Sequence, residues 1–461
     1  MSLNIKPISS RGPLVPVAAG TALVLVTYVT PMATLAPTSA DLGTGATANA
    51  WILSAMSIGL AGALLAGGLL GDRLGRRRVY IGGLLAVIVG ALACAAAWDP
   101  WFLVGARVVQ GAGGAAVIAC GLAILAHSYP PGRERLHATA VWGASVGGGV
   151  AGGSLLAMAL DIGTAWRENY AAAAVAGVLL LVPTLRAIPD SRAATPRRID
   201  IGGLVLLIIG MVLLVSTLTQ VRDGVGLAAL LLALLTLASF AALWLVERWA
   251  RQPLVDPDLL RHPSFLATTL GALTLGIGMI GMASFLPMVA QLGFGDSLRM
   301  ASVPPLIWAV TSMLASLALR RLPFQLQGPL PIAALLALTA AGMLTAVGAD
   351  STLWLLIPMS LTGITNGLLT AILGRESVAS AAPDHAAMAS GANSTARYLG
   401  AACGITLFAV IAVNTGADIT EGWTNAVLIA AAITLLGAAV IAAQSVVRRR
   451  QDSRRGLAPV A

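Results

Sequence analysis

The chain has 461 residues, of which 57% are hydrophobic and only 10% are charged, and its formal net charge is +9. A water-soluble protein of this length cannot bury so many apolar side chains in its core, because the buried fraction of the surface rises only slowly with chain length. The composition therefore excludes a soluble enzyme or a soluble nucleic-acid-binding protein, and it predicts an integral membrane protein.

Apolar runs of about 20 residues are long enough to cross a hydrocarbon core of roughly 30 Å. Fourteen such runs follow one another along the chain. They predict an all-α integral membrane protein with 14 transmembrane helices. The predicted spans are 13–37, 50–70, 79–98, 101–127, 137–160, 168–187, 200–219, 225–246, 264–290, 300–319, 329–348, 352–374, 391–413 and 424–446.

The positions of the cations predict the orientation of these spans, because Lys and Arg stay on the cytoplasmic side of short loops. If both termini are inside, the outer loops keep only Arg167, Arg222 and Arg299, and the other cations, Arg397 among them, fall near the inner face. This predicts a multi-pass protein of the inner cell membrane with cytoplasmic termini. The positive charge is then explained by topology and by contact with anionic lipid, so membrane lipid is a predicted partner and nucleic acid is not.

No segment outside the predicted spans is long enough to form an enzyme domain. Cys94, Cys120 and Cys403 lie in apolar spans without the spacing of metal ligands, so neither a disulfide framework nor a metal or cofactor site is predicted. A lipid-embedded enzyme would need a catalytic dyad or metal ligands at membrane depth, and the sequence offers none. We therefore expect a transporter or channel built from helix faces, and not an enzyme.

The loop between the second and third spans reads GDRLGRRR and resembles the cytoplasmic signature of the major facilitator superfamily. Further matches follow in the family's order: FLVGARVVQGAGGAA resembles its Arg-x-x-Gln-Gly element, and GASVGGGVAGG resembles its glycine-rich motif. The matching residues are Asp72, Arg73, Gly75, Arg76 and Arg77 in the loop, Arg107, Gln110 and Gly111 in the fourth span, and Gly148, Gly149, Gly152 and Gly153 in the fifth.

Other segments, TAWREN and RRIDIGG among them, resemble the fourteen-helix drug:proton antiporter branch of this superfamily, which contains multidrug efflux transporters. The resemblance implies a major-facilitator fold with two pseudo-symmetric six-helix bundles and two inserted helices. The implied division is an N-terminal bundle at 1–190, the inserted helices 7 and 8 at 191–255, a C-terminal bundle at 256–447 and a basic cytoplasmic tail at 448–461.

The charged loop has two interpretations. The arginines alone could be a topology determinant, but a carboxylate inside a cation cluster has no such value. Asp72 could instead accept hydrogen bonds at the N-terminus of a neighbouring helix. The resemblance implies a cytoplasmic gate in which Asp72 and Arg73 bind the start of helix 13, near Ser390 to Asn393.

The fourth and fifth spans carry two further candidates. Arg107 within an apolar helix should cost on the order of 2.5 to 3.5 kcal/mol, which favours a polar functional site shared with Gln110 over snorkelling to the interface. The glycines of the fifth span favour close helix packing. This packing could serve stability alone, or it could limit leak while the helices slide, and the sequence does not separate the two.

Proton coupling requires a group that titrates inside the membrane. The branch pattern places an Asp where this chain has Tyr28, and a Pro where it has Gly149. None of the acidic residues lies in the middle third of a predicted span. Three accounts remain: coupling through a carboxylate at a cavity mouth, indirect coupling through Arg107 with Tyr28, or a facilitator without coupling. The mouth candidates are Asp41, Asp161 and Glu376.

The cavity can be predicted from the helices that line it in related transporters, namely 1, 2, 4, 5, 9, 10, 12 and 13. Beside Arg107 and Gln110, the candidates are Tyr28, Met56, Trp142, Phe285, Met288, Gln291, Trp308 and Asn366. Any one of these aromatic or Met side chains could instead serve packing or face lipid. Together they predict a mostly apolar pocket. Because no acidic residue is predicted inside the membrane, a cationic substrate would lack a counter-ion, which favours neutral, zwitterionic or anionic amphiphiles as substrates.

The sequence as a whole predicts a monomeric exporter of hydrophobic or amphipathic small molecules that works by alternating access. The expected energy source is the proton gradient, and no cofactor is expected. The alternatives are a dedicated exporter or facilitator of one endogenous metabolite or lipid, and a sensor with a degenerate transporter fold.

Overall fold

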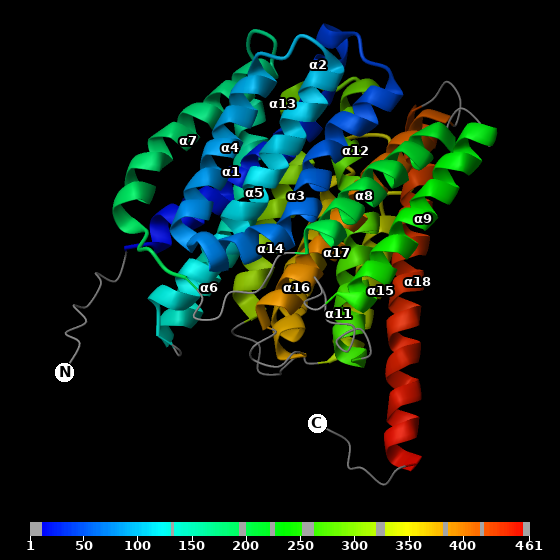
Figure 1. Ribbon diagram of the computed structural model, residues 1–461. Helices are drawn as coiled ribbons and strands as arrows, with labels where there is room; N and C mark the ends of the chain where they lie inside the picture. Colours follow the sequence, from blue (N-terminus) through cyan, green and yellow to red (C-terminus); the bar gives the residue numbers. More distant parts are fainter. Residues whose placement is uncertain are drawn as a thin grey trace, which may run out of the picture.

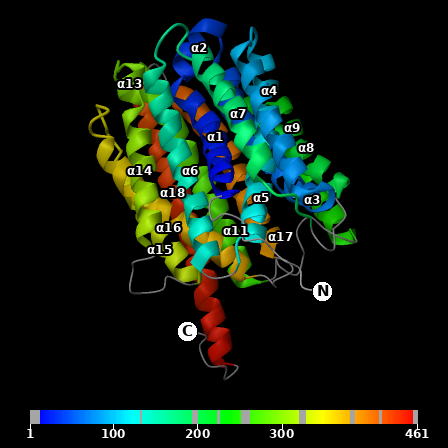
Figure 2. The ribbon, with the colours of Figure 1, turned by 90° about the vertical axis from the view of Figure 1, so that its left-hand side faces the viewer.

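The computed structural model describes residues 12–130, 133–192, 200–221, 226–250, 262–319, 328–380, 386–414 and 419–454. Within these ranges all regular secondary structure is helical, and most helices run side by side in one bundle (Figure 1, Figure 2). The elements are α1 Leu14–Ala33, α2 Leu35–Leu42, α3 Ala46–Leu74, α4 Arg76–Ala95, α5 Pro100–Ser128, α6 Arg133–Ala159, α7 Arg167–Ala187, α8 Ile201–Val221, α9 Leu227–Trp249, α11 Pro263–Leu275, the π-helix η1 Gly276–Ile280, α12 Gly281–Leu292, α13 Leu298–Ala301, α14 Val303–Ala318, α15 Pro329–Leu344, α16 Leu356–Ala379, α17 Ala386–Asn414 and α18 Ile419–Arg454.

Among the described residues, 12 helical segments are long and apolar enough to cross a membrane. The remaining two predicted spans correspond to α15, which is apolar but has 16 residues, and to α17, which has 29 residues but contains Arg397 and many small or polar side chains. The protein is therefore an all-α, multi-pass membrane protein, and the count of 14 helices stays a prediction.

Several helix boundaries differ from the hydropathy pattern. The first predicted span ends early, because the chain breaks at Thr34 between α1 and α2. Helix α17 begins five residues before the predicted span, at Ala386. Helix α18 continues to Arg454, inside the predicted basic tail, and extends below the rest of the bundle (Figure 1). Hydropathy marks only the apolar part of a helix, whereas Arg and Gln are good helix formers that prolong it.

Local sequence explains how neighbouring helices are joined. Asp99 caps α5, since its carboxylate accepts hydrogen bonds from the backbone N–H groups of Trp101 (2.8 Å) and Phe102 (3.2 Å), and Pro100 occupies the first turn. Gly75 alone separates α3 from α4 and has a φ of 108°. Because a side chain rarely adopts this conformation, the loop motif requires glycine at this position.

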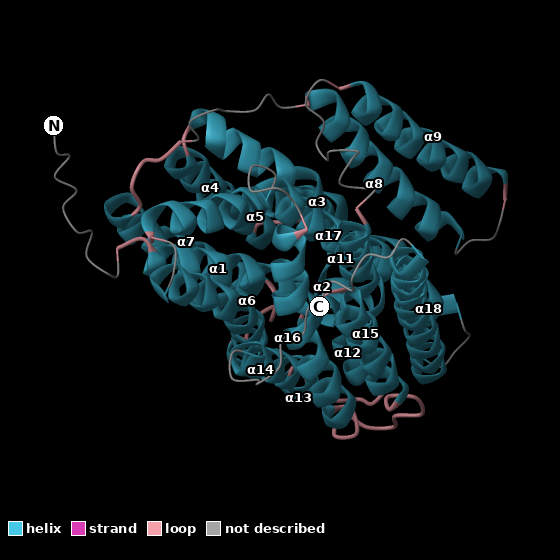
Figure 3. Cartoon of the chain, turned by 90° about the horizontal axis from the view of Figure 1, so that it is seen from below, coloured by secondary structure: helices cyan, strands magenta, loops and turns pink. Residues whose placement is uncertain are grey.

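The two helices that follow α7 lie at the edge of the bundle (Figure 3). Helices α8 and α9 pack against each other, and α8 also contacts α3 and α17 (Figure 3). Leu207, Met211 and Val215 of α8 form a buried cluster with Ile58 and Ala402. The division into two bundles and two inserted helices stays a prediction.

The π-helix η1 lies within the ninth predicted span and packs tightly on α17. A Cβ added at Gly276 would collide with the carbonyl oxygen of Arg397, and one added at Gly404 would collide with the carbonyl oxygen of Ile277. Gly400 approaches the backbone of Leu273 in the same way. Glycines on both sides thus bring the backbones of η1 and α17 into direct contact, which fixes α17 against the ninth span.

Candidate functional site

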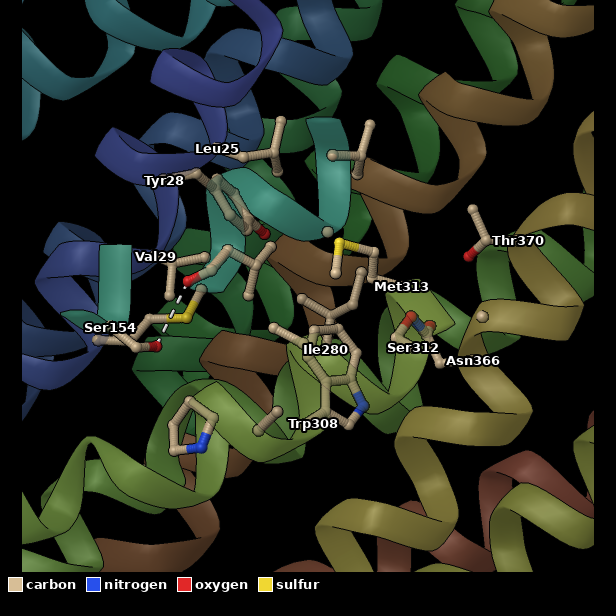
Figure 4. Close-up of a pocket in the computed structure, with 18 of the residues that line it drawn as sticks. Leu25, Tyr28, Val29, Ser154, Ile280, Trp308, Ser312, Met313, Asn366 and Thr370 are labelled. Carbon is tan, nitrogen blue, oxygen red and sulfur yellow. Dashed lines mark hydrogen bonds between the residues drawn. The ribbon is translucent and has the colours of Figure 1, made fainter. Parts of the chain in front are cut away.

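A cavity of about 120 Å³ lies inside the bundle, between α1 and α6 on one side and η1, α12, α14, α16 and α17 on the other (Figure 4). Most of its wall is apolar. The lining residues are Leu25, Tyr28, Val29, Met32, Ala33, Gly143, Val146, Gly147, Val150, Ser154, Ile280, Ala283, Ser284, Pro287, Pro305, Trp308, Ala309, Ser312, Met313, Ser316, Met359, Asn366, Gly367, Thr370, Arg397 and Tyr398.

Three of the predicted cavity residues line this space: Tyr28, Trp308 and Asn366. The hydroxyl of Tyr28 shares a hydrogen bond of 3.0 Å with Ser57 Oγ. Asn366 Nδ2 donates to Ser312 Oγ at 2.9 Å, and Figure 4 shows these two side chains next to each other. The cavity therefore offers a few hydrogen-bonding groups in an apolar wall, as the sequence predicts.

The other predicted cavity residues do not line it. Met56 is fully buried on α3, which contributes no lining residue, and Phe285 and Met288 are buried elsewhere on α12, whose Ser284 and Pro287 border the cavity. The helical repeat of about 100° per residue explains how neighbouring residues of α12 separate in this way. Trp142 also lies outside the lining.

Gln291 has a different position from the one predicted. Its side-chain amide donates to the carbonyl oxygens of Ala33 at 2.9 Å and Pro287 at 3.1 Å. It therefore ties the end of α12 to the end of α1. A second polar tie between the two predicted bundles joins Ser54 Oγ to Thr406 Oγ1 at 2.9 Å.

The sequence missed two residues of α17 that line the cavity, Arg397 and Tyr398. The ring of Tyr398 meets the ring of Tyr28 edge to face at 5.9 Å. Arg397 was expected among the inner-face cations, because the predicted span starts only six residues before it. The earlier start of α17 places Arg397 about three turns inside the helix. A cation this far inside an apolar helix was the signal that could have identified it.

Arg107 lies behind the cavity wall and joins four helices. Its side chain is 1% exposed. Its Nε donates to the carbonyl oxygen of Ile52 on α3 at 2.7 Å, and its Nη1 donates to the carbonyl oxygen of Thr27 on α1 at 3.3 Å and to the hydroxyl of Tyr170 on α7 at 3.2 Å. The side chain does not snorkel to the interface. It connects α5 to α1, α3 and α7.

Gln110 and Gly111 are buried beside this network but contribute no lining residue. The side-chain amide of Gln110 is 0% exposed and neither of its polar atoms has a hydrogen-bond partner. A Cβ on Gly111 would collide with the carbonyl oxygen of Met56, and Gly111 meets Gly59 backbone to backbone. Gly111 therefore permits the close crossing of α3 and α5.

The glycines of α6 face different neighbours. A Cβ on Gly149 would lie 2.5 Å from the carbonyl oxygen of Ala22, and one on Gly153 would lie 3.0 Å from the carbonyl oxygen of Val26. A Cβ on Gly152 would lie 3.3 Å from the Val26 side chain, whereas one on Gly148 would meet no atom within 4 Å. Close packing of α6 on α1 thus depends mainly on Gly149 and Gly153.

The charged loop is bound to its own half of the chain. Asp72 accepts hydrogen bonds from Nε and Nη2 of Arg76 at 3.0 and 2.8 Å. The backbone N–H of Arg76 donates to the carbonyl oxygen of Ser191 at 2.9 Å, and Arg77 Nη2 donates to the carbonyl oxygen of Leu185 at 2.6 Å. These contacts connect the loop to the end of α7.

The predicted contact of Asp72 and Arg73 with Ser390 to Asn393 is absent from this conformation. Asp72 pairs with Arg76 one helical turn away, and Arg73 is exposed. Asn393 instead donates its side-chain amide to the carbonyl oxygen of Thr268 at 3.0 Å. The gate therefore remains a prediction for another conformation of the transport cycle.

We expect Asp72→Asn to slow transport several-fold while changing the free energy of unfolding by less than about 1 kcal/mol, because its ion pair is partly exposed. The measurement is the initial rate of export per inserted protein molecule in membrane vesicles. Arg78→Gln, at an exposed position of the same loop, is the control and should transport at the wild-type rate. Equal rates for wild type and Asp72→Asn would contradict the gate.

The three predicted coupling carboxylates lie outside the cavity lining. Asp41 Oδ2 accepts from Arg167 Nη2 at 3.0 Å and from the indole N–H of Trp166 at 3.1 Å. Asp161 forms an ion pair with Arg299 at 3.5 Å. Glu376 forms an ion pair with Arg375 at 3.2 Å and accepts a hydrogen bond from the backbone N–H of Gly328 at 3.1 Å. Each of the three carboxylates thus forms an ion pair with an arginine near a helix end.

We expect Asp41→Asn to lower the free energy of unfolding by about 0.5 to 1 kcal/mol, because it weakens a partly exposed ion pair, and to leave substrate-dependent proton movement unchanged. A thermal unfolding curve and a pH-sensitive dye inside liposomes measure the two quantities. Asp161→Asn provides the comparison at another ion pair. Loss of proton movement in a folded Asp41→Asn protein would instead identify Asp41 as a coupling group.

A family model described as Major Facilitator Superfamily matches residues 17–405. The chain is 28% identical over 411 residues to a probable actinorhodin transporter of Streptomyces coelicolor, which covers 84% of this chain and 70% of that protein. It is 33% identical over 395 residues to the puromycin resistance protein pur8 of Streptomyces alboniger, covering 82% of this chain and 76% of that protein.

Solved structures share the fold. The crystal structure of the human organic anion transporter MFSD10 (TETRAN) matches with a TM-score of 0.63 at 17% identity, covering 94% of this chain and 99% of that one. At this level of identity the match concerns the arrangement of helices alone.

Proposed function

The chain belongs to the major facilitator superfamily, and from this premise we propose that it exports hydrophobic or amphipathic small molecules, drugs among them. Its family and fold make it a membrane transporter and not an enzyme. The observation that carries the proposal is the largely apolar cavity, which is bordered by helices of both predicted bundles and contains a few hydrogen-bonding groups such as Tyr28, Ser312 and Asn366. Such a wall fits apolar ligands of varied shape.

The names of the relatives support export of antibiotic compounds, since one is a probable actinorhodin transporter and the other a puromycin resistance protein. Alternating access fits the arrangement of the two bundles around the cavity. The hydrogen bonds of Gln291 with Ala33 and of Ser54 with Thr406 would break and re-form as the bundles rock against each other.

The proton gradient is the energy source in this proposal, and transport is antiport. No Asp or Glu is among the described residues that line the cavity, so the titrating group would lie elsewhere. Asp161 and Glu376 are the candidates, since Asp41 is expected to serve only its ion pair with Arg167. The protein would act as a monomer in the inner membrane, with cytoplasmic termini and with anionic lipid beside its positively charged loops.

Purified protein in liposomes with an imposed pH gradient and an interior pH dye tests this function. A panel of neutral, anionic and cationic amphiphiles is added in turn. Substrate flux with proton movement in the opposite direction supports drug:proton antiport. Substrate flux without proton movement would identify a facilitator, and absence of flux for the whole panel would contradict export.

A dedicated exporter of one endogenous metabolite is the second candidate. The name of the actinorhodin transporter, which refers to a single compound, favours it. The same panel separates the two candidates, because a multidrug exporter transports several unrelated amphiphiles whereas a dedicated exporter rejects most of them.

A further inference from the structure

Arg397 is the one charged side chain among the described residues that line the cavity. Its Nε is buried and has no hydrogen-bond partner. Arg107, the other arginine inside the bundle, differs in this respect, since its guanidinium donates to Ile52, Thr27 and Tyr170. The protein thus satisfies Arg107 with its own oxygens, whereas the buried Nε of Arg397 has no such partner.

The position of Arg397 is fixed by backbone packing. Its carbonyl oxygen lies against Gly276 of η1, and Gly400, three residues later, lies against Leu273. These contacts prevent α17 from turning about its axis to carry the guanidinium away from the cavity. The neighbouring ring of Tyr398 borders the same space and meets Tyr28 at 5.9 Å.

A second donor without a partner borders the cavity, because the indole N–H of Trp308 is also buried and unpaired (Figure 4). A cation buried among apolar groups is costly unless a counter-ion or an acceptor satisfies it. Since neither an Asp nor a Glu is found among the described lining residues, a bound ligand is the natural source of the missing negative charge.

We infer that Arg397 binds an anionic group of the transported molecule, so that the substrates include amphiphiles with a carboxylate or sulfonate attached to an apolar body. This inference rests on the proposed export function and names a substrate class for the same cavity. The planar guanidinium can bind such a group through two parallel hydrogen bonds, while the apolar wall binds the remainder of the molecule.

The test uses two fluorescent ligands, dansyl-leucine and its methyl ester, in which one methyl group removes the negative charge of the carboxylate. Binding to the purified full-length protein is measured by fluorescence titration, separately from transport. We expect Arg397→Gln to weaken binding of the acid roughly 10- to 100-fold, as befits loss of a charge-assisted hydrogen-bond pair, and to change binding of the ester less than about twofold. Arg397→Lys should recover part of the affinity for the acid.

Thermal unfolding gives a second readout. The acid should raise the melting temperature of the wild type but not that of Arg397→Gln. Without ligand, Arg397→Gln should melt no lower than the wild type, because it removes a partly buried cation that has no counter-ion among the described lining residues. A wild type that does not bind the acid, or an Arg397→Gln variant that loses acid and ester equally, would overturn the inference.

Transport in liposomes of phosphatidylcholine alone separates this inference from the export proposal. Flux of the ester together with unchanged acid affinity in Arg397→Gln contradicts the anion site and leaves export standing. Charge-dependent binding without flux of any probe supports the anion site and contradicts export. Displacement of the acid by added phosphatidylglycerol would assign the site to a lipid headgroup and overturn the small-molecule assignment.

Discussion

Arg107→Ala is expected to lower the free energy of unfolding by about 3 kcal/mol and to abolish transport. The substitution removes hydrogen bonds to Ile52, Thr27 and Tyr170, and a single bond to a charged group contributes about 1.5–3 kcal/mol. The desolvation cost of the buried guanidinium offsets part of this sum. Transport should fail because α1, which carries the cavity residue Tyr28, loses the hydrogen bond that joins its Thr27 to α5.

Two variants make this prediction specific. Tyr170→Phe removes one of the three acceptors of Arg107. It should lower the free energy of unfolding by about 1 kcal/mol and reduce transport without abolishing it. Arg107→Lys keeps the charge but lacks the planar guanidinium that reaches three oxygens at once. Its stability and transport should therefore be closer to those of Arg107→Ala than to those of the wild type. The melting temperature in detergent and flux in liposomes are measured for each. Full transport by Arg107→Ala would show that α1 is held in place without this network.

Alanine at two adjacent glycines of α6 should shift stability in opposite directions. At Gly149 the new Cβ would lie 2.5 Å from the carbonyl oxygen of Ala22 and 2.7 Å from Leu25 Cβ. Both atoms belong to α1, and backbone gives way less easily than a flexible side chain, so we expect a loss of about 1–3 kcal/mol. At Gly148 the Cβ would meet nothing within 4 Å, and the better helix propensity of Ala should add about 0.5–1 kcal/mol.

Melting temperatures of Gly148→Ala and Gly149→Ala, measured side by side, check the prediction. Transport should be reduced only for Gly149→Ala, because a displaced α1 carries Leu25 and Tyr28 away from the opposite wall of the cavity. If both variants melted above the wild type, α6 and α1 would have room to separate, and the close-packing interpretation of this motif would fail.

The sequence predicted the helices and the family motifs well, because both depend on local patterns. Long apolar runs identify helices, and the requirement for glycine at position 75 follows from a turn with φ of 108°. The sequence motif included both Gly148 and Gly149, but it did not show that only Gly149 packs against α1. Which of two adjacent glycines faces α1 depends on the rotation of α6, and that rotation is set by tertiary packing.

The cavity was predicted only in part for the same reason. Hydropathy placed Met56 and Phe285 on helices expected to line it, yet both lie in packed contacts. The cation pattern also assigned Arg397 to the inner face, because the predicted span begins only six residues before it, whereas α17 begins earlier, at Ala386. Tyr28, Trp308 and Asn366 border the cavity, and they lie on helices that line it in related transporters. Their role in substrate binding stays a prediction.

The π-helix η1 is a position at which this protein could lose one residue without disrupting the helix that contains it. A π turn contains one residue more than the α turn it replaces, so deletion of a single residue between Gly276 and Ile280 could restore a continuous α-helix without rotating the segments on either side. Ser284 and Pro287 would keep their orientation toward the cavity. The same deletion in α14 would turn every later side chain by about 100°. Deletion of one residue, which would disrupt most membrane helices, is therefore a route by which this chain could change the position of α17 and keep the rest of the cavity wall.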